Sequence, residues 1–129
     1  MRPPRGAGRK TRTEGDPLAV SVLTTSRTQA SPAPADAYTA RGWSVHRPAL
    51  DVEVADTVGA GDSFTAGLIG SLLRRGQYAP ADLARCPADE LSGALDDAIL
   101  VASVNCERRG NDPPTAADVA AARLRLKPT

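Results

Sequence analysis

A glycine-rich run near the middle of the chain constrains its fold more than any other feature. The run reads Asp56-Thr57-Val58-Gly59-Ala60-Gly61-Asp62-Ser63-Phe64. Before it, Val52 and Val54 alternate with acidic residues, and this pattern predicts a half-buried strand. After it, apolar residues recur at helical spacing as far as Gly76, where we expect the helix to end. The run therefore joins a predicted strand to the start of a predicted helix.

A strand, a glycine-rich turn and a helix start together form an anion site, because the first amides of a helix have no partner within it. We expect Gly59, Ala60, Gly61 and the amide of Asp62 to surround a phosphate. A Walker loop would place a lysine after its glycines, whereas here an acid follows them. A carboxylate repels phosphate, so Asp62 needs a chemical reason. General-base catalysis supplies one, because an aspartate can take the proton of an alcohol that attacks a γ-phosphate.

The same run, D-T-x-G-A-G-D-x-F followed by Thr65-Ala66-Gly67-Leu68-Ile69, resembles the C-terminal signature of the ribokinase-like (PfkB) carbohydrate kinases. The resemblance implies an α/β fold, namely the C-terminal part of a three-layer α/β/α sandwich. It also implies that Asp62 is the catalytic base, and that residues 59–61 with the Asp62 amide form the anion hole under the γ-phosphate. The implied reaction transfers phosphate from ATP, with Mg²⁺ on the nucleotide, to a sugar or sugar-like small alcohol.

Residues 102–115 extend this resemblance, because they are similar to the helix and loop that close the nucleotide pocket in the family. By resemblance, Ile99 and Ala102 lie near the adenine. The family also has a monovalent-cation site beside the phosphate loop, which K⁺ would occupy. The residues at the matching positions are Asp56, the backbone of Val58, and the carbonyls of Asn105, Arg108 and Gly110.

Other interpretations of these residues stay open. Asp62 can simply cap the helix that follows it, and Asp56 can be an ordinary turn residue. A second class of function is a non-catalytic nucleotide- or anion-binding module that associates with another chain. A third interpretation is nucleic-acid binding through the basic start of the chain, although the favoured prediction has no nucleic-acid and no membrane partner.

The chain divides into two unlike parts. Residues 1–36 are rich in Arg, Pro, Gly, Ser and Thr, and we expect them to be a largely disordered segment with one short strand near Leu18–Leu23. Residues 37–129 are expected to be the kinase-like part. The first 47 residues hold eight Lys and Arg against three Asp and Glu, and the remainder holds eight against twelve. The resemblance covers about the last third of a typical family member, so we expect a truncated gene or a shifted reading frame upstream of about Ala37.

Three further elements are predicted in the second part. Tyr38–Ala40 and Trp43–His46 flank Arg41-Gly42 and predict a hairpin, on which Trp43 and His46 are interpreted as packing or surface residues. A long helix is expected from about Pro87 to Glu107, with one apolar face. Thr115-Ala116-Ala117-Asp118 predicts a capping box that begins a last short helix.

Cysteine spacing and hydropathy limit the kinds of site and the cellular location expected for the protein. Cys86 and Cys106 lie twenty positions apart without metal-ligand spacing, so we expect neither a zinc site nor a disulfide framework. Cys106 is interpreted as a small buried side chain. No apolar run approaches the roughly 20 residues that span a bilayer. We therefore expect a cytoplasmic protein, and a homo-oligomer is left open.

Overall fold

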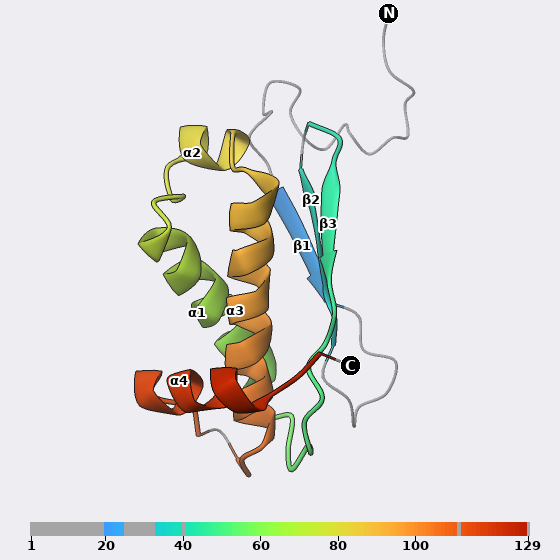
Figure 1. Cartoon of the computed structure of the whole chain (residues 1–129), viewed down its shortest axis with the longest axis vertical. Coiled ribbons are helices and arrows are strands. Elements are labelled where there is room, and N and C mark those ends of the chain that lie inside the picture. Colours follow the sequence, from blue (N-terminus) through green and yellow to red (C-terminus); the bar gives the residue numbers. More distant parts are fainter. Residues whose placement is uncertain (1–19, 25–32, 40, 111, 129) are drawn as a thin grey trace, which may run out of the picture.

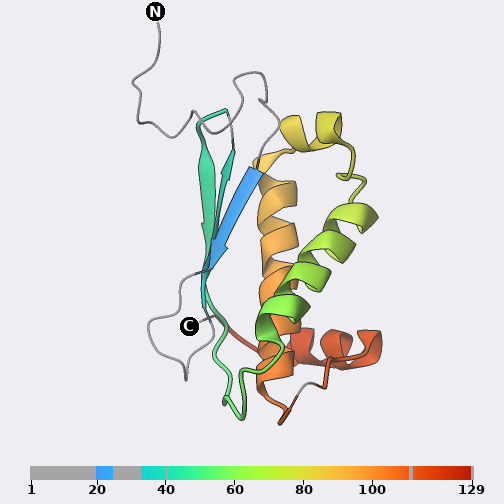
Figure 2. The same ribbon diagram turned by 180° about the vertical axis from the view of Figure 1, so that it is seen from behind.

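The computed structural model of the chain describes residues 20–24, 33–39, 41–110 and 112–128. A three-stranded sheet lies on one side of the molecule, and the helices lie on the other (Figures 1 and 2). The elements are β1 (Val20–Thr24), β2 (Ala35–Thr39), β3 (Ser44–Arg47), α1 (Ala60–Arg74), α2 (Pro80–Ala84), α3 (Ala88–Cys106) and α4 (Ala116–Arg125). The predicted α/β class is confirmed. All four described helices cover the same face of the sheet, so they form no third layer on its other face.

The sheet is antiparallel throughout, with β2 between β1 and β3. Val22 lies opposite Ala37, and Ala37 lies opposite Val45, so one face of the sheet carries a row of apolar side chains. The predicted hairpin is confirmed: Gly42, at φ 100°, turns the chain, and the amide of Thr39 donates to the carbonyl of Trp43 at 3.0 Å. Glycine suits this turn because a positive φ strains other residues.

The start of the chain is described in part. The predicted short strand is confirmed for Val20–Leu23 as part of β1, whereas residues 1–19 and 25–32 lie outside the described residues. The prediction of disorder for those residues therefore stays a prediction. Strand β2 begins at Ala35, two residues before the expected start of the kinase-like part.

The predicted strand at Val52 and Val54 is wrong. Both valines are half-buried and the acidic residues that alternate with them, Asp51 and Glu53, are exposed, so the alternation in the sequence does report burial. The backbone, however, finds no neighbouring strand. Instead, the amide of Asp51 donates to the carbonyl of Lys127 at 2.7 Å, and the amide of Ala55 donates to the carbonyl of Cys106 at 2.7 Å. Because Lys127 follows α4 and Cys106 ends α3, neither partner belongs to a strand, and the segment forms no β-ladder.

Helix α3 is the centre of the core. Its predicted bounds agree with the structure to within one residue at each end. Its side chains Leu91, Leu95 and Ile99 are buried against the apolar face of the sheet, together with Cys86. Figures 1 and 2 show α3 between the sheet and α1.

Two shorter helices complete the structure. Helix α4 begins at the predicted capping box, in which the amide of Asp118 donates to the Thr115 hydroxyl and the amide of Thr115 donates to Asp118. Hydrogen bonds that the Asp118 carboxylate accepts from the Thr115 amide, from Arg108 and from the Thr115 hydroxyl lower the pKa of Asp118 to about 2. Helix α2 was not predicted, although Pro80 at its first position and an Asp82 carboxylate that accepts from the Ala79 amide at 3.2 Å are ordinary helix-start signals.

Helices α1 and α3 approach closely at Gly67. A Cβ atom built on Gly67 would lie 3.1 Å from Cβ and Cγ2 of Val101, and 3.2 Å from Cα of Ala98. The same construction at Gly70, one turn along, meets only the end of the flexible Arg74 side chain at 3.4 Å. Only the first glycine is therefore required by the packing of the two helices.

We predict that Gly67→Ala lowers the free energy of unfolding by about 1–3 kcal/mol through overpacking. Gly70→Ala is the matched control, and it should leave stability unchanged or raise it by up to about 1 kcal/mol, because alanine favours the helix. Urea unfolding measures both variants. Equal effects of the two substitutions would contradict this packing.

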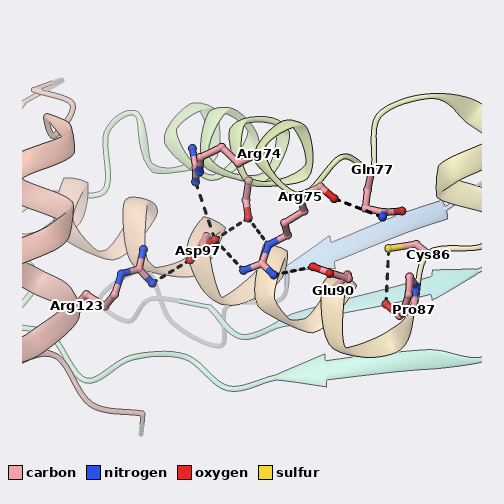
Figure 3. Close-up of polar contacts among 9 residues, drawn as sticks. Arg74, Arg75, Gln77, Cys86, Pro87, Glu90, Asp97 and Arg123 are labelled. Carbon is pink, nitrogen blue, oxygen red and sulfur yellow. Dashed lines mark hydrogen bonds and ion pairs between the residues drawn. The ribbon is translucent and has the colours of Figure 1, made fainter.

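A carboxylate on α3 holds three helices together. Asp97 is buried, accepts a hydrogen bond from the Ser71 hydroxyl at 2.6 Å and forms an ion pair with Arg123 of α4 at 3.0 Å (Figure 3). Arg75, the residue directly after α1, lies 3.3 Å from Asp97 and also pairs with Glu90 at 2.9 Å. Gly93 makes room for this guanidinium, since a Cβ there would lie 2.6 Å from it.

The ionisation of Asp97 is part of this contact. Burial alone would raise the pKa of Asp97, but hydrogen bonds from Ser71, Arg123 and Arg75 outweigh it and hold the pKa below 3.8. A lowered folded-state pKa adds stability that is present above the unfolded value and is lost as the pH falls through the folded value. The contribution is therefore complete at neutral pH, begins to fall near the unfolded value of about 4 and is lost once the pH passes below the lower folded-state pKa.

We predict that Asp97→Asn lowers the free energy of unfolding at pH 7 by about 1–3 kcal/mol, less than for a fully enclosed pair because Arg123 is half exposed. The loss should shrink as the pH falls below about 4 toward the lowered pKa of Asp97, because the parent chain then loses the contribution of the ionised carboxylate as well. Asp96→Asn is the control, because Asp96 pairs with Arg47 nearer the surface and should cost no more than about 1 kcal/mol. A loss that is independent of pH would contradict the assignment.

Candidate active site

The glycine-rich run forms a tight turn that opens directly into α1. Gly59 has a φ of 81° and is the residue before the helix, which begins at Ala60. The amide of Ala60 donates to the carbonyl of Thr57 at 3.2 Å, and the amide of Ser63 donates to the carbonyl of Gly59 at 2.9 Å. Glycine is required at position 59 because a side chain would be strained at this φ.

Two backbone amides at this helix start are left for a ligand. Among the described residues, the amides of Gly61 and Asp62 make no hydrogen bond. A Cβ built on Gly61 would meet nothing within 4 Å, so the packing of the described chain does not require glycine there. Alanine would favour the helix by about 1 kcal/mol. A glycine that costs stability without a packing reason is consistent with space kept for an approaching anion.

Asp62 lies at the third position of α1 and is exposed. Its carboxylate makes no hydrogen bond or ion pair within the described residues, and α1 has no side-chain cap. The alternative in which Asp62 caps the helix is therefore not the arrangement observed. The carboxylate stands beside the free amides, where a negative side chain is favoured by the helix dipole.

Asp56 connects the loop to the segment that follows α3. Its two oxygens accept from two backbone amides, Oδ1 from Val58 at 3.0 Å and Oδ2 from Gly110 at 2.9 Å. These bonds, the one from Gly110 foremost, hold the pKa of Asp56 below its ordinary value. Asp56 is thus a turn residue and also a long-range contact, since Gly110 is 54 positions away.

The C-terminal end of α3 holds the loop from the other side. The carbonyl of Cys106 accepts from the amides of Ala55 at 2.7 Å and of Asp56 at 3.2 Å. The side-chain amide of Asn105 donates from Nδ2 to the carbonyl of Val58 at 2.7 Å, and Asn105 has no exposed surface. The family resemblance gives Asn105 a role only through its backbone carbonyl, so this side-chain contact was not predicted.

The residues expected at a monovalent-cation site are brought together only in part. Asp56, Val58, Asn105 and Gly110 lie around the loop, as the bonds above require. For Arg108 the expectation concerned the carbonyl, and that assignment stays a prediction, while its side chain pairs with Asp118 at 2.7 Å. Within the described ranges, no group of three or more His, Cys, Asp or Glu side chains could hold a metal ion.

The comparison with protein families agrees with this geometry. The model of the pfkB family of carbohydrate kinases matches residues 30–117, which include the loop and all of α1, α2 and α3. The chain belongs to the pfkB carbohydrate kinase family. None of the curated proteins compared matches the sequence. The α/β arrangement of the described residues is that of part of the ribokinase-like fold.

The two residues expected near the adenine of a pfkB kinase differ in how far they are buried. Ile99 is 3% exposed and belongs to the core between α3 and the sheet, so it offers almost no surface to a nucleotide here. Ala102 is half-buried. The assignment of these two residues to an adenine pocket stays a prediction.

The remaining residues singled out from the sequence have structural roles. Cys86 and Cys106 are buried free thiols, and burial raises the pKa of each. His46 is exposed and lies 2.6 Å from Asp36 on the neighbouring strand, while Trp43 packs against the core. In the part of the chain that the structure describes, no helix is long and apolar enough to cross a membrane.

We predict that Asp56→Asn loosens the contact between the loop and Gly110, because asparagine has one acceptor oxygen for two amides and carries no charge. Amide hydrogen exchange should accelerate severalfold at both Val58 and Gly110. Asp112→Asn is the control, since Asp112 is an exposed neighbour paired with Arg108. Unchanged protection at Gly110 in the Asp56 variant would rule out this contact in solution.

Proposed function

We propose that this member of the pfkB family transfers the γ-phosphate of ATP to a hydroxyl group of a sugar or a similar small alcohol. Asp62 is the general base, and the free amides of Gly61 and Asp62, placed by the turn at Gly59, form the anion hole, whereas the Ala60 amide donates to Thr57 and is not available. The observation that carries the proposal is the exposed Asp62 carboxylate, without a partner in the described chain, beside the two free amides at the start of α1.

The reaction assigns separate work to the carboxylate and the amides. The acceptor oxygen forms a bond to the γ-phosphorus while the bond between that phosphorus and the β,γ-bridging oxygen breaks, and ADP leaves. The hydroxyl proton passes to Asp62 as the oxygen attacks. The amides stabilise the negative charge of the transferring group, and because the turn at Gly59 fixes them in advance they need no rearrangement.

The position of Asp62 at the start of the helix is consistent with separate roles for its carboxylate and its backbone amide. A carboxylate that repels the bound phosphate is unfavourable for simple anion binding, yet it is the group that an attacking alcohol needs nearby. The amide of the same residue faces the anion hole. One residue can thereby set the distance between the proton acceptor and the phosphate.

The proposal includes Mg²⁺ bound to ATP, where the ion would neutralise charge on the phosphates. The described residues offer no cluster of carboxylates for a metal, so we assign no protein ligand to Mg²⁺. We place the reaction in the cytoplasm as part of the same proposal, since both cysteines are free thiols.

A second candidate function is a non-catalytic nucleotide- or anion-binding module that associates with another chain. The observation that favours it is the outer face of the sheet, where Leu23 and Tyr38 are exposed on neighbouring strands and no described helix covers them. Another chain could cover that face and complete the sheet. In this function Asp62 would have no role in chemistry.

We predict that Asp62→Asn lowers the rate of ATP-dependent phosphorylation by about 10²- to 10⁴-fold, because it removes the proton acceptor. ATP binding should be unchanged or tighter, since a repelling charge is gone. Release of ADP with a panel of sugars measures the rate, and calorimetry measures binding.

Asp89→Asn is the matched control, because Asp89 is an exposed acid in the first turn of another helix, α3. It should change neither rate nor binding. Nucleotide binding without phosphorylation in the parent chain, with tighter binding after Asp62→Asn, would favour the binding module. Absence of nucleotide binding would exclude both functions.

A further inference from the structure

The carbonyl of Val58 is the group through which a side chain of α3 contacts the glycine-rich loop. It belongs to the residue directly before Gly59, so its direction fixes the peptide that leads into the turn. Nδ2 of Asn105 donates to this carbonyl at 2.7 Å, across 47 positions of sequence. The green loop and the orange end of α3 lie side by side in both ribbon views (Figures 1 and 2).

The Asn105 side chain can only be oriented in one way. A carbonyl oxygen accepts hydrogen bonds, so the nitrogen of the amide, rather than its oxygen, has to face Val58. The other atom, Oδ1, is then buried without a hydrogen-bond partner in the described structure. An unpaired buried oxygen is unfavourable for stability. The residue is therefore better explained by what Nδ2 does for the loop than by a contribution of its own to folding.

Most of the other oxygens expected to bind a monovalent cation, those of Asn105, Gly110 and Asp56, are also engaged within the chain. The carbonyl of Asn105 accepts from the amide of Arg108 at 3.1 Å, and the carbonyl of Gly110 accepts from the amide of Asp112 at 3.1 Å. Both carboxylate oxygens of Asp56 accept from backbone amides. Potassium sites in proteins are built from carbonyl oxygens directed at the ion. In the described arrangement a cation would have to compete with these N–H donors for the same oxygens, and with the Asn105 amide for the carbonyl of Val58.

We propose that Asn105 is a positioning residue that holds the phosphate loop in place of a monovalent cation, so that the loop has its anion-binding geometry without K⁺. The N–H of Asn105 presents a partial positive charge to the carbonyl of Val58, where an ion would otherwise bind, and this donor is part of the fold rather than drawn from solution. The part of this inference that concerns ATP binding rests on the proposed function, whereas the part that concerns the stability of the chain does not.

The first test uses the parent chain alone. Its thermal midpoint should be the same in potassium chloride and in tetramethylammonium chloride at equal ionic strength, since tetramethylammonium is too large for a carbonyl site. A midpoint that rises saturably with potassium would overturn the proposal. This measurement needs no nucleotide, so it separates a failure of this proposal from a failure of the proposed kinase function.

The second test removes the donor. In Asn105→Ala, ATP binding measured in tetramethylammonium should weaken by about tenfold or more, the effect of one lost hydrogen bond to the loop, and potassium should restore part of it. Ser103→Ala is the matched control, because Ser103 is buried on the same helix and its hydroxyl has no partner in the described structure. It should change neither binding nor its dependence on potassium.

Two results would overturn the role of Asn105. One is equal loss of ATP binding in Asn105→Ala and Ser103→Ala, which would indicate a general effect of altering α3. The other is an Asn105→Ala variant that binds ATP as tightly as the parent chain in tetramethylammonium. If Asn105→Ala does not fold, the potassium test on the parent chain decides the proposal by itself.

Discussion

The apolar face of α3 packs on the sheet through Leu91, Leu95 and Ile99, and the other described elements take their positions from that contact. Helix α1 lies against the opposite side of α3, where Gly67 allows the backbones to approach. Helix α4 is tied to the same helix through Asp97 and Arg123. One buried helix thus contacts the sheet and two further helices, and its C-terminal end reaches the glycine-rich loop before α1.

The loop depends on α3 as much as on its own glycines. Its sequence explains the turn at Gly59 and the helix start, but hydrogen bonds from the end of α3 decide where the loop points. A site held by backbone and side-chain groups of a rigid helix can keep its amides aligned before a ligand arrives. The packing of α3 in the core therefore also determines the geometry of the candidate active site.

The sequence predicted the elements whose signals are local. The hairpin around Gly42, the long helix after Pro87 and the capping box at Thr115 agree with the structure, because each is encoded by residues a few positions apart. The strand at Val52 and Val54 was wrong because alternating burial does not supply a neighbouring strand. Helix α2 was missed because only one turn of sequence carries its signals.

The sequence by itself determined the family and the chemistry of the loop: an acid after small residues, at the start of a helix, in the run from Asp56 to Asp62. Only the tertiary structure decided which groups hold that loop. Asn105 meets Val58, Gly110 meets Asp56, and Asp97 meets Arg75 and Arg123 across distances of 22 to 54 positions. Contacts of this kind follow from how the helices pack, and no local pattern encodes them, because a buried polar residue has its partner only once the chain has folded.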